Sequence, residues 1–320
     1  MKSLYCDFQY VKTGHHDQDF MILNKYCDGN LEHIKFNEHN FFRNILLIMK
    51  TLKRKENKTI GTVSFLCLYI ASLFSRNWNY NLVIHFFPQV HCNLYKFLFS
   101  VFIKKCKNII VFADCVKKDI LSKTESKLDS KIVEIHQREL HFLKKEHTEE
   151  EKTILCIGNL NSIKLIEPLF HILQENKFEH IHFKFICNGI QNRLKNMGFS
   201  NILNNNLTIE DRFPVLENYL SEINKATYTF LDYSEKYGSR SSAVMLDSLS
   251  QGTPVICCKN PSFSELVEKY NCGYIFHNEI ELKNILSEIN SGILKTPAIS
   301  ELLINFYSER ENKKLAQVLI

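Results

Sequence analysis

Short apolar runs alternate with longer segments of helical period along the whole chain, and this alternation constrains the fold more than any other feature. An apolar run of about four to eight residues is the length of a buried strand, whereas a helix needs about ten or more residues. Strands separated by helix-length segments form repeated strand–helix–strand units around parallel sheets. The sequence therefore predicts an α/β protein built from doubly wound parallel sheets.

The expected elements fall into two groups of similar length. The first half has expected strands at residues 3–8, 31–36, 59–63, 82–86, 109–113 and 131–135. The second half has them at residues 153–158, 182–187, 200–203, 227–231, 254–257 and 273–276, with helices at 279–289 and 298–313. A charged, non-periodic stretch at residues 141–152 is the expected linker. Because 320 residues exceed the usual size of one core, we expect two Rossmann-like domains, residues 1–150 and 151–320.

Charge is distributed unevenly between these halves. Residues 1–150 hold 23 basic and 16 acidic residues, whereas residues 151–320 hold 17 and 19. The basic excess either attracts an anionic partner to the first half or is an ordinary solvated face. Nothing resembles a nucleic-acid-binding module, so we expect no nucleic-acid partner.

Cysteine usage and hydropathy indicate the compartment. The 11 cysteines show no paired metal-ligand spacing, and many lie inside apolar runs, which is typical of reduced core thiols. The first ten residues do not resemble a signal peptide, and no apolar run reaches the roughly 18–20 residues of a membrane span. We therefore expect a cytoplasmic protein.

A polar loop followed by a helix and a buried strand is the most informative segment. The loop carries Arg240, Ser241 and Ser242, Gly252 ends the helix, and Pro254 begins the strand. A helix N-terminus after a parallel strand presents free N–H groups and the positive end of the helix dipole, and Ser and Arg donors match phosphate oxygens. The alternative is that Ser241 or Ser242 only caps the helix and Arg240 is solvated.

This segment resembles the donor site of GT-B glycosyltransferases. Their signature is an acidic residue on the helix, then small residues, a Gly and a Pro-Val-Ile strand, which correspond to residues 247–256 here. Further matches occur in the same order, at residues 154–158 with Lys164, and at 183–189, 264–267 and 271–274. The resemblance covers essentially the whole chain and is most specific between residues 153 and 276. It implies two Rossmann-like domains facing a cleft and transfer of a sugar from a nucleotide-sugar donor.

The resemblance also implies roles for individual residues. Lys164 and Arg240 would contact the diphosphate, and Asp247 would accept hydrogen bonds from the ribose hydroxyls. The full set of expected donor-binding residues is Gly14, Asn159, Lys164, Gly189, Arg240, Ser241, Ser242 and Asp247. Many retaining members carry a first glutamate where this chain has Ser239, so inversion and retention both stay open.

The loop after the first expected strand supplies candidate bases. It carries Gly14, His15 and His16, and in GT-B proteins this loop faces the bound sugar. A histidine titrates near working pH, so His15 or His16 could deprotonate an acceptor hydroxyl, and Asp7 is the next candidate. The alternative is that the loop caps the following helix and the histidines lie in solvent.

Two more histidines, His85 and His91, lie near the end of another expected strand. Ligand-facing residues collect at the carboxyl ends of parallel strands, so they either line the acceptor cleft or pack near the core. No third ligand completes a metal site with them. We expect no catalytic metal and no cofactor beyond the nucleotide-sugar substrate.

Residues 41–55 and 95–107 mix apolar and aromatic side chains with basic residues. Such helices either lie on an anionic membrane surface, where a lipid-linked acceptor is presented, or face the core with a charged end. The resemblance implies a glycosyltransferase of surface-glycan biosynthesis that acts on a glycan or lipid-linked acceptor. The enzyme would be cytoplasmic, either free or in peripheral contact with the inner face of a membrane. The alternatives are a nucleotide-sugar epimerase or hydrolase on this fold and a non-catalytic nucleotide-sugar-binding homologue.

Overall fold

The computed structural model of the protein comprises two compact units. The structure describes residues 3–9, 20, 23–24, 30–37, 40–62, 65–84, 93–112, 114–124, 126–134, 152–160, 164–199, 206–212, 216–238, 240, 242–297 and 299. The expected domain boundary after residue 150 and the expected helix at 298–313 lie outside this description.

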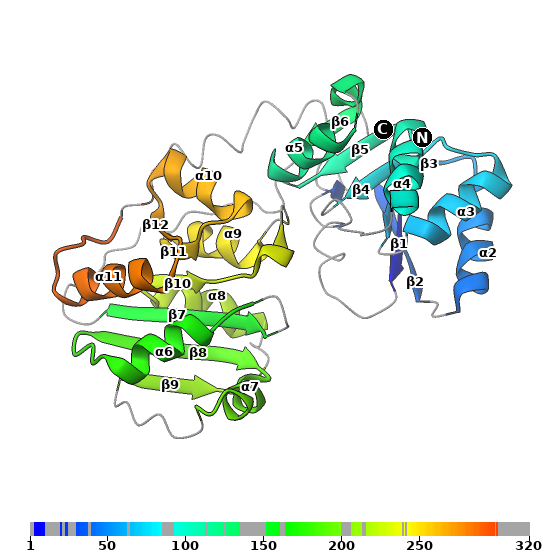
Figure 1. Ribbon diagram of the computed structural model, residues 1–320. Helices are drawn as coiled ribbons and strands as arrows, with labels where there is room; N and C mark the ends of the chain where they lie inside the picture. The colour runs from blue at the N-terminus through cyan, green and yellow to red at the C-terminus, as the bar shows by residue number, and fades with distance from the viewer. Residues whose placement is uncertain are drawn as a thin grey trace. The chain divides into compact units, whose positions relative to one another are not determined.

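The first unit is a six-stranded sheet with the order β2-β1-β3-β4-β5-β6, in which every pair of neighbours is parallel (Figure 1). Its strands are β1 (Ser3–Gln9), β2 (Leu31–Asn37), β3 (Asn57–Thr62), β4 (Asn81–Ile84), β5 (Asn108–Val111) and β6 (Ile132–Glu134). Its helices are α2 (Phe41–Leu52), α3 (Phe65–Ser75), α4 (Asn93–Lys105), α5 (Asp114–Lys123) and the short 3-10 helix η1 (Ser126–Lys131).

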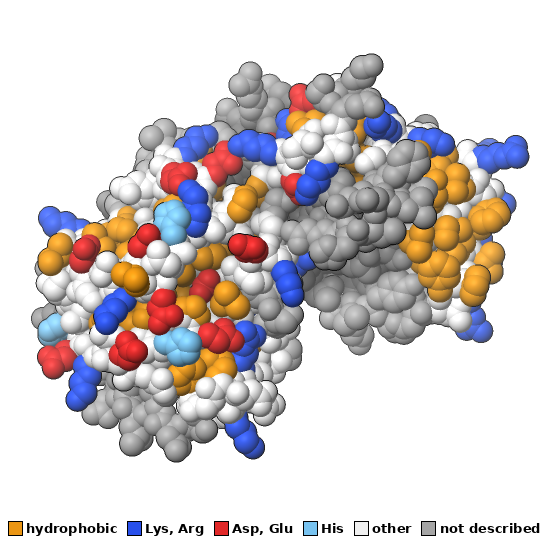
Figure 2. Space-filling view, viewed as in Figure 1, with side chains coloured by type: hydrophobic (Ala, Val, Ile, Leu, Met, Phe, Trp, Pro, Cys, Tyr) orange, Lys and Arg blue, Asp and Glu red, His pale blue; other side chains and the backbone are white. Residues whose placement is uncertain are grey.

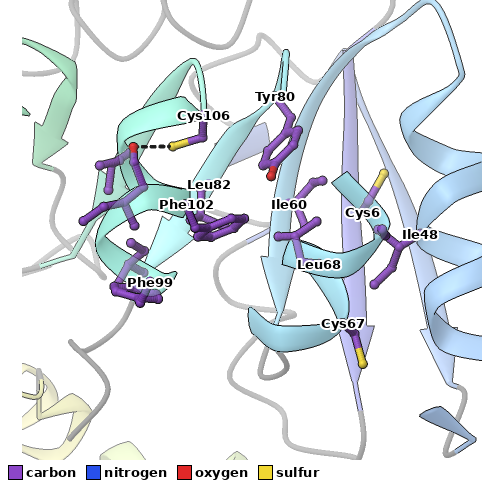
Figure 3. Packing of buried hydrophobic residues seen from close by; sticks show 14 of the residues in the cluster. Cys6, Ile48, Ile60, Cys67, Leu68, Tyr80, Leu82, Phe99, Phe102 and Cys106 are labelled. Atoms are coloured by element: carbon purple, nitrogen blue, oxygen red, sulfur yellow. Dashed lines mark hydrogen bonds between the residues drawn. The ribbon is translucent and has the colours of Figure 1, made fainter. Parts of the chain in front are cut away.

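Alternate residues of these strands face the two sides of the sheet, as the two-residue period of a strand requires. On β4, Leu82 and Ile84 face a core shared with α2, α3, α4 and α5, part of which is shown in Figure 3. Val83 points to the other face, where it packs with Tyr5 and Phe112. Both faces of β4 are therefore buried, which explains the continuous apolar run at Leu82–Ile84.

The second unit is also a six-stranded parallel sheet, with the order β12-β11-β10-β7-β8-β9. Its strands are β7 (Lys152–Asn159), β8 (Ile181–Asn188), β9 (Leu207–Glu210), β10 (Tyr228–Leu231), β11 (Val255–Cys258) and β12 (Gly273–Phe276). Its helices are α6 (Glu167–Glu175), α7 (Ile190–Asn196), α8 (Leu216–Lys225), α9 (Ala243–Ser250), α10 (Pro261–Tyr270) and α11 (Glu279–Asn290), with the 3-10 turn η2 (Glu235–Tyr237).

Helices cover both faces of this second sheet. On one face Leu155 and Ile157 of β7 pack with Ile223 of α8. On the other, the Phe170 ring of α6 lies 4.8 Å from the Phe185 ring of β8, measured between centroids. The unit is thus the doubly wound layer structure that the alternating pattern predicts.

The strand expected at residues 200–203 lies outside the described residues. The edge strand β9, at Leu207–Glu210, was not predicted. No helix in the described part of the chain is long and apolar enough to cross a membrane.

The segments at residues 41–55 and 95–107, expected to form helices that face either a membrane surface or the core, differ in the side chains that they expose. In the described part of α4, Phe99, Phe102 and Ile103 are buried while Lys104 and Lys105 are exposed, as in a core-facing helix with a charged end. The helix α2 buries one face but also exposes Phe42 and Leu46.

Candidate functional site

The strand order of the second sheet contains one topological switch point. From β7 the chain proceeds outward to β8 and β9, and then returns to β10 beside β7 and proceeds outward to β11 and β12 on the other side. Adjacent connections that leave in opposite directions open a crevice at the carboxyl ends of the two strands between them, where doubly wound proteins bind ligands. A ligand-binding site is therefore expected at the carboxyl ends of β7 and β10.

Lys164 lies at this switch point. Its backbone forms an isolated antiparallel bridge with Tyr233, two residues beyond the end of β10. Its ammonium donates to the Ile157 carbonyl on β7 at 2.6 Å and lies 6.0 Å from the centre of the Tyr233 ring. The side chain, 2 % exposed, thus links the ends of the two strands.

The charge of this ammonium is preserved by its neighbours. Burial lowers the pKa of Lys164, but the Cys156 and Tyr233 side chains outweigh that effect, and the pKa lies above its ordinary value. The Cys187 thiol, 3.8 Å from the Cys156 sulfur, and Lys164 itself lower the pKa of Cys156 against the effect of burial. A cation is therefore held inside the protein at the switch point, where it favours an anionic ligand.

Gly158 separates Lys164 from the first turn of α9. It follows Ile157 on β7 and has a φ of +117°, a backbone conformation that residues other than glycine rarely adopt. A Cβ atom at this position would lie 3.9 Å from Lys164 Nζ and 3.9 Å from Val244 Cγ2. The end of β7, the buried ammonium and the start of α9 are thus within a few ångströms of one another.

The helix α9 begins at this place with a capped N-terminus. Ser242 is its N-cap, and the Ser242 hydroxyl accepts a hydrogen bond from the Met245 N–H at 3.3 Å. Burial raises the pKa of Tyr233 overall, but the Ser242 side chain acts to lower that pKa, so the cap lies beside this residue just beyond β10. The first amides of a helix have no partner within the helix, and the helix dipole is positive there, so this end attracts anions.

Arg240 lies in the loop that leads to this cap. Gly238, with a φ of 58° and a ψ of −139°, ends η2 and turns the chain toward it. The Arg240 side chain is half-buried. We call Gly158, Lys164, Tyr233, Arg240 and Ser242 the switch-point site.

The structure also describes three other predicted donor-binding residues, Asn159, Gly189 and Asp247. Asn159 ends β7 with an exposed side chain, and Asp247 is buried in α9 at 1 % exposure. Gly189 precedes α7, and its N–H donates to the Asp211 carboxylate at 2.7 Å, while the Gln191 N–H donates to the same carboxylate at 3.1 Å. The amides at the start of α7 therefore already bind an anion of the protein itself.

The remaining predicted site residues are not located by the structure. Gly14, His15, His16, His85, His91 and Ser241 lie outside the described residues. Asp7 is in β1, where it is in register with Lys35 and Gly61, but its side chain is not described. Among the described residues, no group of His, Cys, Asp and Glu side chains could hold a metal ion.

Sequence reasoning missed Tyr233 of the switch-point site and its neighbour Asp232. They directly follow β10, and the rule that ligand-facing residues follow parallel strands would have found them. Asp232 is 4 % exposed, and burial raises its pKa to about 6. The Tyr233 ring packs against Tyr237 and Phe263, with ring centroids 4.3 and 5.5 Å away.

Comparison with known proteins identifies the fold. No family model matches the chain, and no curated protein matches its sequence. Among solved structures, Anabaena HepE in complex with UDP has a TM-score of 0.74 at 13% identity, covering 100% of this chain and 99% of that one. HepE was also solved with UDP-glucose, at a TM-score of 0.74 and 13% identity over 99% of both chains.

A second similar structure is the lipopolysaccharide outer core galactosyltransferase WaaB, in its apo form. Its TM-score is 0.64 at 13% identity, and 98% of each chain is covered. A glycosyltransferase from Rickettsia africae has a TM-score of 0.64 at 14% identity, covering 99% of this chain and 93% of that one. The fold is therefore the GT-B fold of glycosyltransferases, as the sequence resemblance implied.

Proposed function

We propose that this chain is a glycosyltransferase that binds a nucleotide sugar at the switch-point site of its second unit. One observation carries the proposal: a buried, charged Lys164 and the N-terminus of α9 lie together at the switch point of a doubly wound sheet. A nucleotide sugar has a diphosphate, and both a cation and a helix N-terminus favour that group.

UDP is the nucleotide to test first. HepE, which shares the fold, was solved with UDP and with UDP-glucose. Fold alone does not select a base, so ADP and GDP belong in the same panel. The acceptor in this proposal is a hydroxyl of a glycan or of a lipid-linked sugar in surface-glycan biosynthesis, and the reaction needs no metal.

The proposed chemistry is displacement at the anomeric carbon. The acceptor hydroxyl forms a new bond to that carbon, the bond from the carbon to the diphosphate oxygen breaks, and the nucleoside diphosphate leaves with the electron pair. Lys164, Arg240 and the first turn of α9 would stabilise the charge that develops on the leaving group. In an inverting reaction the hydroxyl proton passes to a base, for which His15, His16 and Asp7 are the candidates.

Calorimetry with UDP tests this proposal. Lys164→Met keeps an apolar stem of similar length but removes the charge, and we expect UDP affinity to fall by about 1.5–3 kcal/mol, the range for a charge-assisted hydrogen bond. Lys195→Met, on the exposed side of α7, is the matched control and should bind UDP normally. Thermal unfolding of both variants shows whether Lys164→Met still folds. Unchanged affinity in folded Lys164→Met would remove Lys164 from the site.

The binding-only and hydrolase alternatives differ from transfer in their products. Ser239 stands where many retaining enzymes have a glutamate, and this departure keeps those alternatives in view. Transfer gives a glycosylated acceptor, whereas hydrolysis gives free sugar and a binding protein gives neither. NMR of the anomeric centre distinguishes these outcomes and also reads inversion against retention.

A further inference from the structure

Two neighbouring helices of the first unit, α2 and α3, expose large apolar side chains. The exposed side chains are Phe41, Phe42 and Leu46 on α2 and Leu66, Leu73 and Phe74 on α3. Phe42 and Phe74 are the most exposed of them, at 74% and 72%. We call these six side chains the α2–α3 surface.

This surface is separate from the stripe that each helix buries. On α2 the core residues are Ile45, Ile48 and Leu52, whereas Phe42 and Leu46 are four positions apart and share another face. The helix α3, with sequence FLCLYIASLFS, has no charged residue, although Leu73 and Phe74 near its end are exposed. Because α2 and α3 pack against each other, the exposed side chains form one region and not scattered single contacts.

Basic side chains surround the α2–α3 surface. Residues 40–84 contain seven Lys and Arg residues and one acidic residue, Glu56. Six of the basic side chains are exposed, namely Arg43, Lys50, Lys53, Arg54, Lys55 and Arg76. Figure 2 shows the apolar side chains gathered over this part of the first unit, with Lys and Arg at the margin.

We propose that the α2–α3 surface docks on an anionic phospholipid bilayer. Aromatic and aliphatic side chains enter the boundary between headgroups and acyl chains, and the basic margin lies over the anionic headgroups. A second copy of this chain fits less well, since each copy would bring six exposed basic side chains to the interface. The proposal does not depend on nucleotide binding, because its residues all belong to the first unit.

Vesicle flotation tests the proposal. The full chain should float with vesicles rich in phosphatidylglycerol at low salt, should be released as salt screens the attraction, and should not float with pure phosphatidylcholine. The double variant Phe42→Gln, Phe74→Gln should weaken vesicle binding about tenfold or more, because it removes two large apolar side chains. The triple variant Lys53→Gln, Arg54→Gln, Lys55→Gln should weaken it roughly a hundredfold at low salt, or about fivefold per basic residue.

Matched control variants lie in the second unit. Ile280 and Ile293 are 73% and 71% exposed, so Ile280→Gln, Ile293→Gln removes equally exposed apolar side chains elsewhere. The change of Lys177, Lys195 and Lys225 to Gln removes three exposed charges elsewhere. Both control variants should float like the unaltered chain.

Three results would overturn the proposal. One is equal flotation of all variants, and another is equal binding to phosphatidylcholine and phosphatidylglycerol vesicles. The third combines two observations. The unaltered chain does not float, and light scattering shows a concentration-dependent dimer that is lost when Phe42 and Phe74 are changed. That result would assign the surface to a second copy of the chain. UDP calorimetry on the same samples separates the two proposals, because normal flotation without UDP binding would contradict only the proposed function.

Discussion

At the residue scale, two buried ionisable groups of opposite tendency lie just after the ends of β7 and β10, namely Lys164 of the switch-point site and Asp232. Lys164 stays charged because Cys156 and Tyr233 favour its ammonium, although burial opposes it. For Asp232, burial dominates, and its pKa is raised from 3.8 to about 6. Lys164 therefore supplies positive charge to the site at neutral pH, whereas ionisation of Asp232 lowers the free energy of unfolding.

Asp232→Asn should stabilise the protein in a pH-dependent way. The folded pKa lies above the unfolded one, so the protonated carboxyl favours folding below about pH 4, and that contribution is lost as pH rises through about 6. Near pH 7 the amide variant should gain up to about 3 kcal/mol in free energy of unfolding, at 1.36 kcal/mol per pKa unit. Urea unfolding across this pH range measures the difference. A gain that does not change with pH would contradict the prediction.

Gly158→Ala should weaken both folding and nucleotide binding. Its left-handed φ penalises a side chain by about 1–2 kcal/mol, and the added methyl group would lie between Lys164 and α9, where a diphosphate must approach. Gly198 has a φ of +79° with nothing within 4 Å of an added Cβ, so Gly198→Ala is the matched control. We expect both variants to lose stability and only Gly158→Ala to lose UDP affinity, by about tenfold in calorimetry. Equal affinities would place the diphosphate elsewhere.

At the element scale, α9 connects the switch-point site to the sheet. Its N-cap Ser242 lies in the site, and its buried Ser248 hydroxyl donates to Thr229 Oγ1 on β10 at 2.9 Å. The orientation of the helix N-terminus is therefore fixed by the strand whose end forms the crevice. A rigid helix end is what pre-organised anion binding requires.

Ser242→Ala should destabilise the protein and also weaken UDP binding. Loss of an N-cap costs about 0.5–2 kcal/mol, and the first turn of α9 would lose its fixed geometry. Asn278 caps α11 in the same way, accepting from the Glu281 N–H at 2.9 Å, but lies outside the site. Asn278→Ala should therefore lose similar stability in urea unfolding and retain UDP affinity. A parallel loss of affinity in both variants would indicate a general effect of instability.

The elements also show what sequence patterns can and cannot predict. Buried strands such as β4 and β11 are continuous apolar runs, and the pattern located them to within about two residues. The edge strand β9 was missed although Leu207 and Ile209 alternate with Thr208 and Glu210, because four half-buried residues are too few for this alternation to stand out in the sequence.

The same limit applies to the site. The loop and helix around Ser242 could be predicted because they are contiguous in sequence. The bridge between Lys164 and Tyr233 could not, since it depends on which strands become neighbours, and β7 and β10 are separated by two other strands along the chain. The contact of Gly189 with Asp211 also depends on tertiary structure, and it shows that a glycine after a strand need not be open to a ligand.

At the scale of the whole molecule, two units with separate cores allow separate tasks. The second unit contains the switch-point site, and the first contains the basic margin and the α2–α3 surface. Under the proposed function, donor binding belongs to the second unit, and the base that activates the acceptor belongs to the first. Substitution of a base in the first unit should then lower turnover and leave donor affinity unchanged.

His15→Ala and His16→Ala test this division. If either histidine is the base of an inverting reaction, its loss should lower turnover by roughly 10²–10⁴-fold, because the acceptor hydroxyl keeps its proton, while UDP affinity stays unchanged. His171, exposed on α6, is the matched control, and His171→Ala should change neither quantity. Steady-state release of UDP from the nucleotide sugar measures turnover, and calorimetry measures affinity. Full activity in both first-unit variants would make Asp7 the next candidate base, and retention at the anomeric carbon would exclude single displacement with a base altogether. A fall in UDP affinity equal to the fall in turnover would contradict the division itself, because it would mean that the histidines bind the donor.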